Sequence, residues 1–154
     1  MPDPSKKPQH LRAIILIRIL WLLSIALSAV IIYLSWIPDS RMGLVPWLPR
    51  WLAGWADSGG GVETLRTGLA LAIASFLFSL ACQASGRRNG IRFSLGFGLL
   101  LVLLAEGGQF FLPARSPDWG DVAWGGLGAM AGVIAAVAIL SILRKCLSKK
   151  APTA

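Results

Sequence analysis

The sequence predicts an all-α polytopic membrane protein with four transmembrane helices and a short tryptophan-rich interfacial helix in the first outer loop. Three observations lead to this class. The 154-residue chain is 55% hydrophobic with a mean hydropathy of +0.67, which is too apolar for an ordinary soluble globular domain. Four apolar segments reach the roughly 20-residue length that crosses a bilayer core. Basic residues gather beside alternate ends of these segments, as in chains that keep positive charge in the cytoplasm.

The four apolar segments form one membrane domain over residues 13–143, between basic cytoplasmic tails at 1–12 and 144–154. All four segments should be helical, because lipid offers no hydrogen-bond partner to an unpaired backbone amide. The segments cover residues 13–37, 67–85, 93–112 and 122–143.

The first segment follows basic residues, as a secretory signal does, but its apolar run is far longer than the core of a cleaved signal peptide. We therefore expect an uncleaved anchor helix that Pro38 terminates. Arg18 lies near the start of this helix, where a long side chain can reach the head groups. An anchoring role for Arg18 is favoured over a ligand-binding role.

The net charge of +8 is distributed as a membrane topology signal rather than as a nucleic-acid-binding surface. Ten basic residues flank the segment ends on one side and four lie on the other. Both termini are therefore predicted to be cytoplasmic, with the loops 38–66 and 113–121 outside. The ten are Lys6, Lys7, Arg12, Arg87, Arg88, Arg92, Arg144, Lys145, Lys149 and Lys150, and the four are Arg41, Arg50, Arg66 and Arg115.

Tryptophans recur in the first outer loop. Trp47, Trp51 and Trp55 are spaced four residues apart, which predicts a short helix with an apolar stripe. Pro49 suits the first turn of such a helix. A helix of this kind anchors in the head-group layer, and a lid that covers a site is the alternative.

Glycines mark one face of the fourth segment. Gly125, Gly128 and Gly132 predict a face that lets another helix approach closely. The same face is a candidate contact for a membrane-protein partner or a second copy of the chain. Gly126, Gly128 and Ala131 imitate part of a dinucleotide-binding loop, but that loop must follow a strand, so no such cofactor is expected.

Charged residues also occur at the outer ends of the third and fourth segments. Glu106 and Gln109 share one face of the third helix, and a carboxylate inside a span must be paired, protonated or facing water. The short turn that follows makes the two helices antiparallel neighbours, which brings Arg115 and Asp121 to the same place. The guanidinium can neutralise the carboxylates or hold an anionic head group. A structural tie and a functional site both remain open.

The start of the fourth helix carries ordinary capping chemistry. Ser116 is the expected N-cap, Pro117 fits the first helical position, and Asp118 favours the positive end of the helix. No metal is expected, because the carboxylates form no compact ligand pattern. The only histidine, His10, lies in the basic tail, so no imidazole is expected on the outer face.

The segment EGGQFFLPARSPDWGDVAWGGLGAMAG resembles a pattern of VanZ-like membrane proteins, in which a Glu- and Gln-bearing helix leads through a P-x-R turn to an Asp and a glycine-containing helix. The four-helix layout and SWIPDS at the end of the first helix agree with this resemblance. It implies a multi-pass protein of the bacterial inner membrane, from a family linked to teicoplanin resistance whose members are proposed to act on lipid head groups or envelope glycans. The matching positions are Glu106, Gln109, Pro113, Arg115, Asp121 and Gly128.

Two positions depart from the family pattern. Members commonly carry D-K-x-x-H before the second helix, where this chain reads DSGGGVETLRTG. Glu63 can replace the acid, but Thr67 or Gly61 occupies the place of the histidine, and Gly125 replaces an asparagine. If the histidine transfers protons in the family, this chain has lost that chemistry or moved it to another acid. Enzymatic activity is therefore left open.

The resemblance and the residues together give two main hypotheses. The protein either binds or processes membrane lipids or lipid-linked envelope intermediates, or it is a non-catalytic accessory subunit of an envelope-glycan or exopolysaccharide assembly. In the first case Glu106 and Asp121 are the candidate catalytic residues, and Arg115, Gln109 and Glu63 are the candidate substrate-binding residues. A proton-coupled exporter is disfavoured, because Glu106 is expected too close to the outer surface.

Overall fold

The computed structural model describes residues 7–39, 41–59, 61–113 and 118–150, in which the regular secondary structure is helical and no strand occurs. This confirms the all-α class. The α-helices are α1 (Lys7–Ser35), α2 (Arg50–Ala56), α3 (Val62–Ala84), α4 (Gly90–Gly107) and α5 (Trp119–Lys150), with 3₁₀ turns η1 (Met42–Leu44) and η2 (Gly108–Phe111).

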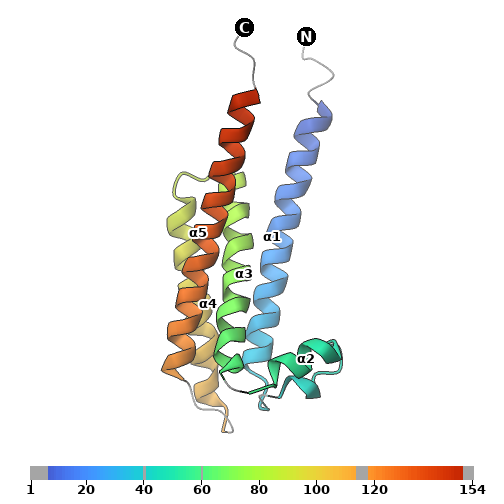
Figure 1. Ribbon diagram of the computed structural model, residues 1–154, viewed down its shortest axis with the longest axis vertical. Coiled ribbons are helices and arrows are strands. Elements are labelled where there is room, and N and C mark those ends of the chain that lie inside the picture. The colour runs from blue at the N-terminus through green and yellow to red at the C-terminus, as the bar shows by residue number, and fades with distance from the viewer. Residues whose placement is uncertain (1–6, 40, 60, 114–117, 151–154) are drawn as a thin grey trace.

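Four of these helices, α1, α3, α4 extended by η2, and α5, are long and apolar enough to cross a membrane. They run side by side along one axis, while α2 lies across the end of α1 (Figure 1). The start of α1 and the end of α5 lie together at the opposite end of the bundle (Figure 1). We call these two ends the α2 end and the terminal end. The four-span layout and the tryptophan-rich short helix are confirmed.

The first and last spanning helices, α1 and α5, are longer than the spans predicted from hydropathy. The first helix begins at Lys7 and the last continues to Lys150, so both enter the segments predicted as basic tails. At the α2 end, the Asp118 carboxylate accepts a hydrogen bond from the Gly120 N–H at 2.7 Å, which satisfies a free amide at the start of α5. The predicted capping residues Ser116 and Pro117 lie outside the described residues.

The central helix of the bundle is α3, which packs against α1, α4 and α5. Its closest neighbour is α5, because two glycines there allow backbone contact. A Cβ added at Gly128 would overlap the carbonyl of Gly68, and one added at Gly132 would overlap the carbonyl of Ala72. The close approach predicted for these glycines is therefore present, and the approaching helix is α3 of the same chain.

Small side chains also bring α4 close to both neighbours. A Cβ added at Gly98 would lie 2.7 Å from the Ala129 Cβ and 2.8 Å from the Ser75 Oγ. Nearer the α2 end, Leu71 and Val102 are almost fully buried and fill the space beside Gly125. The three helices α3, α4 and α5 thus form a tightly packed unit.

The first helix is attached to this unit by two tryptophans, Trp21 at its midpoint and Trp36 just after its last residue. Near the terminal end, the Trp21 Nε1 donates to the Ser85 Oγ at 3.3 Å, and its ring meets Phe78 edge-on. At the α2 end, the Trp36 Nε1 donates to the Leu104 carbonyl at 3.1 Å. The Trp36 indole fills the position that a side chain at Gly108 would occupy.

The backbone contact predicts opposite effects for two glycines of the same helix. The Gly126→Ala variant adds its methyl to open space and should be neutral or slightly stabilising, because Ala favours a helix over Gly by up to about 1 kcal/mol. The Gly128→Ala variant must push α5 away from Gly68 and should cost about 1–3 kcal/mol. Thermal unfolding of both purified proteins in detergent measures this difference. Equal unfolding temperatures for the two variants would contradict the proposed contact.

Candidate functional site

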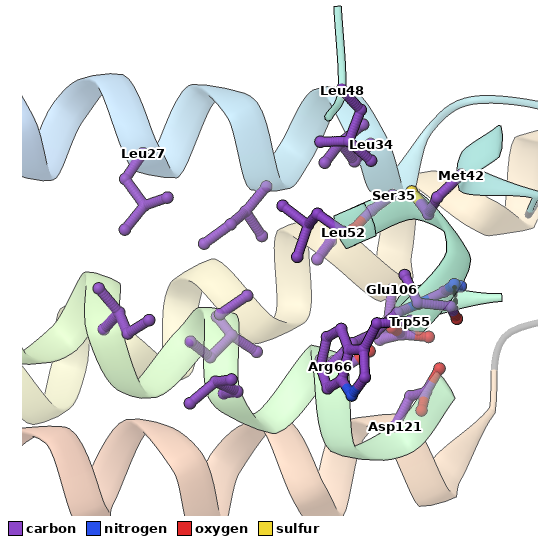
Figure 2. Close-up of a pocket in the computed structure, with 18 of the residues that line it drawn as sticks. Leu27, Leu34, Ser35, Met42, Leu48, Leu52, Trp55, Arg66, Glu106 and Asp121 are labelled. Carbon is purple, nitrogen blue, oxygen red and sulfur yellow. Dashed lines mark hydrogen bonds between the residues drawn. The ribbon is translucent and has the colours of Figure 1, made fainter. Parts of the chain in front are cut away.

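A cavity of about 290 Å³ lies between α1 and α3, beside α2. The part of its wall farthest from the α2 end is apolar. Leu27, Ile31 and Leu34 contribute from α1, and Leu71 and Ile73 contribute from α3. Figure 2 shows Leu27 and Leu34 along the α1 side of this space. A cavity with such a wall favours hydrocarbon over water.

The other end of the cavity is polar. Four side chains that line it come from four different elements: Arg66 from α3, Glu106 from α4, Gln109 from η2 and Asp121 from α5. Arg66, Glu106 and Asp121 gather at this end in Figure 2, far from Leu27. The lining therefore changes from apolar to polar along the length of the cavity.

Glu106 and Gln109 point into the bundle, as their spacing predicts. Their side chains are only 5% and 6% exposed, and the Gln109 amide donates to the Glu106 Oε1 at 3.5 Å. Asp121 is partly exposed and lines the same cavity, so the antiparallel pairing of α4 and α5 brings the three together. Arg115, the predicted cation of this group, lies outside the described residues.

Glu63 does not join this group. It is exposed in the first turn of α3 and is absent from the described lining of the cavity. Its carbonyl accepts a hydrogen bond from the Thr67 hydroxyl at 3.3 Å. Thr67 itself does line the cavity, one residue after Arg66. Thr67, one of the two positions compared with the histidine of the VanZ-like pattern, therefore lines the cavity, whereas Glu63, compared with the acid of that pattern, is absent from its described lining.

Arg66 is the cation that sequence reasoning missed as a site residue. Its Nη1 donates to the Ala56 carbonyl at 3.1 Å and lies 3.8 Å from the Asp57 Oδ1, and its side chain is 18% exposed. In the sequence it counted only as an outer-loop charge. The sequence signal for this role was its position one residue before a predicted span, where a basic side chain can point either to solvent or into the bundle.

Asp57 holds the loop around the cavity in shape. Its two carboxylate oxygens accept hydrogen bonds from the backbone N–H groups of Met42 and Gly43, each at 2.8 Å. One carboxylate thus connects η1, the end of α2 and, through Arg66, the start of α3. Charge-assisted bonds of this kind are among the stronger ones in proteins.

The tryptophan-rich helix has one side on the cavity and another side exposed. Trp51 is 75% exposed and faces away from the bundle, as an interfacial anchor would. Trp55, together with Leu48 and Leu52, lines the cavity. The helix α2 therefore forms one wall of the cavity while it presents Trp51 to the surroundings.

Asp39 and Arg41 form a separate pair at the surface of the same loop. The Arg41 Nη2 donates to the Asp39 Oδ2 at 2.7 Å. This hydrogen bond and the charge of Asp39 raise the pKa of the Arg41 guanidinium above its usual value. The pair is absent from the described lining of the cavity, so its charges do not belong to the site.

No protein-family model, curated protein or solved structure matches the chain.

Glu106 and Asp121 are the side chains of the cavity that carry ordinary acid–base chemistry, among the lining residues that the structure describes. In the described ranges, no three His, Cys, Asp or Glu side chains lie together in a metal-binding group. The site can therefore offer a guanidinium, an amide and two carboxyl groups beside an apolar space.

The Asp57 bridge predicts a local effect on the loop. The Asp57→Ala variant removes the acceptor of two backbone N–H groups and should destabilise residues 42–57 by about 2 kcal/mol, since hydrogen bonds to charged groups contribute roughly 1.5–3 kcal/mol. Hydrogen–deuterium exchange should show faster exchange in this segment. The control is Asp39→Asn, which removes the charge of a solvent-exposed ion pair, keeps an oxygen that can accept from the Arg41 backbone N–H, and should leave that exchange unchanged. Unaltered protection in Asp57→Ala would refute the bridge.

Proposed function

We propose that the protein binds a lipid of the outer membrane leaflet, with the hydrocarbon tail between α1 and α3 and the head group at the polar end of the cavity. The observation that carries this proposal is the change of lining along one cavity, from Leu27 and Ile31 to Arg66, Glu106 and Asp121. An amphipathic ligand matches both ends, whereas a water-soluble ligand would leave the apolar wall hydrated.

The tail end of this site lies among the spanning helices, at the depth expected of the bilayer hydrocarbon. Helix α1 contacts both α3 and α4. The two tryptophans that attach it, Trp21 and Trp36, are absent from the described lining of the cavity. Each buried methylene of a chain contributes about 0.8 kcal/mol relative to water, but far less relative to the bilayer. The apolar wall therefore accommodates the tail, and the polar end must supply the selectivity.

The polar end favours a head group with both a negative charge and hydrogen-bond donors. Arg66 can bind a phosphate oxygen, while Glu106, Gln109 and Asp121 offer oxygen atoms that accept hydrogen bonds from hydroxyl groups. A small anion without donors could bind Arg66 but would offer no hydrogen bond to the two carboxyl groups. We therefore favour a lipid-linked envelope glycan, whose phosphate and sugar hydroxyls suit both sets of side chains.

A processing activity at this site would use Glu106. It lies deepest among the acids of the cavity and is 5% exposed, so it can hold a proton or accept one away from bulk water. Gln109 beside it can orient the carboxyl group. This role needs no histidine, so it is compatible with Thr67 or Gly61 at the place where the VanZ-like pattern has one.

The proposed orientation places the α2 end outside and both termini in the cytoplasm of a bacterial cell, with the chain in the inner membrane. The start of α1 and the end of α5 share one end of the bundle (Figure 1). Arg87, Arg92 and Arg144 lie at that end, where the positive-inside rule expects cytoplasm.

The head-group site is tested with lipids and envelope intermediates that copurify in mild detergent, measured by native mass spectrometry. We expect Arg66→Gln and Glu106→Gln each to reduce retention of a phosphate-containing lipid at least about tenfold, because each removes a charge-assisted contact of roughly 1.5–3 kcal/mol. Arg50→Gln and Glu63→Gln are the matched controls, since both residues are exposed and outside the described lining. Equal retention in all four variants would exclude a head-group site here.

The tail site is tested separately on α1. Leu27→Trp places a larger side chain in the apolar part of the cavity and should displace the lipid without changing any polar residue. Leu23→Trp adds the same bulk at a half-exposed position outside the described lining and should retain the lipid. The readout is again the bound lipid per protein. Full retention in Leu27→Trp would show that the tail lies elsewhere.

A further inference from the structure

A second hollow, of about 610 Å³, lies at the terminal end of the bundle. Four arginines from three parts of the chain line it: Arg87 and Arg88 from the turn between α3 and α4, Arg92 from α4, and Arg144 from α5. Arg144 is distant in sequence from the other three, so the bundle fold is what assembles the group. The hollow lies at the opposite end from the lipid cavity, and its argument rests on the proposed orientation of the bundle but not on the proposed lipid cavity.

No carboxylate neutralises these arginines among the described residues. All described acidic side chains lie at the α2 end, and both described ion pairs, Arg41–Asp39 and Arg66–Asp57, are found there. Four guanidinium groups that line one hollow repel one another unless an anion lies between them. The described acids are Asp39, Asp57, Glu63, Glu106, Asp118 and Asp121.

The turn that carries two of these arginines has a defined geometry. The Gly86 residue adopts a left-handed conformation, with φ of 69°, directly after α3. Its N–H bonds to the Gln83 carbonyl and the Arg87 N–H bonds to the Cys82 carbonyl, which together form a Schellman motif. This motif fixes where Arg87 and Arg88 leave the helix.

One of the guanidinium groups is also held from the side. The Arg87 Cζ lies 5.4 Å from the centre of the Trp21 ring, and Trp21 is fixed in turn by Ser85 and Phe78. A guanidinium that stacks on an aromatic ring keeps its N–H groups available to an anion. At least one hydrogen-bond donor of the hollow, the Arg87 guanidinium, is therefore held in place by a neighbouring side chain.

We propose that this hollow binds the head group of a lipid with two phosphate groups in the leaflet at the terminal end. The hollow lies where α3 ends and α4 begins, at the depth of lipid head groups, and Ile91 and Phe93 beside it expose apolar surface. Basic pockets between transmembrane helices on the cytoplasmic side suit such lipids. A single phosphodiester would offset one of the four positive charges, whereas two phosphates bind two guanidinium pairs bidentately.

The test measures binding of defined lipids to the full chain in detergent, by native mass spectrometry and thermal shift. The probes are cardiolipin with two phosphates, phosphatidylglycerol with one, zwitterionic phosphatidylcholine, and soluble pyrophosphate. We expect the wild type to retain cardiolipin at least roughly tenfold better than phosphatidylcholine, and the double variant Arg92→Gln/Arg144→Gln to lose at least about tenfold in that retention.

The charge-matched control is Arg12→Gln/Arg18→Gln on α1, at the same end but outside the described lining of the hollow, and it should change cardiolipin retention less than about twofold. If the first double variant does not fold, Arg88→Gln at an exposed turn position replaces it. Equal losses in the two double variants would reduce the effect to general attraction and overturn the proposal. Preference for pyrophosphate over cardiolipin, or no preference for cardiolipin, would overturn it as well.

Discussion

The backbone contact between α3 and α5 at Gly128 and Gly132 is the constraint on which the rest of the structure depends. Because an added Cβ at either glycine would overlap a carbonyl of α3, the two helices approach as closely as their backbones allow. This contact places α5 on one face of α3 and leaves the other face to α1. It also brings the start of α5, with Asp121, alongside Glu106 at the end of α4.

Helix α1 contacts α3 in a different way from α5, and the cavity results from that difference. Trp21, at the middle of α1, and Trp36, just after its last residue, hold α1 to the other helices through hydrogen bonds and ring contacts. Between them, Ile31 packs into the core with Leu71 and Leu101, while Leu27, Ile31 and Leu34 also form one side of the cavity. Glycine pairs close one interface of α3 and large aliphatic side chains leave the other one partly open, so the same helix supplies both the rigid support and the cavity wall.

The parts that sequence reasoning predicted are those that depend on spacing along one helix. Span number follows from apolar length, and the inward orientation of Glu106 follows from the cost of exposing a carboxylate to lipid. The roles of Arg66 and Asp57 could not be predicted, because they depend on how the loop of residues 36–61 folds back across the bundle. Glu63 was assigned from resemblance rather than from periodicity, and its side chain lies outside the cavity.

The opposed charges at the two ends of the bundle follow from one requirement. Four arginines, Arg87, Arg88, Arg92 and Arg144, lie close together at the terminal end once α3, α4 and α5 pack, as the positive-inside rule expects of a cytoplasmic face. The described acids collect at the α2 end, where Arg66 is the described cation that lines the cavity. The proposed anionic ligand therefore suits the arginines of the terminal end, while the ligand proposed for the α2 end must also donate hydrogen bonds to its carboxyl groups. The closely packed pair of α3 and α5 runs between the two regions, so the two proposed lipid sites lie apart, at opposite ends of the bundle.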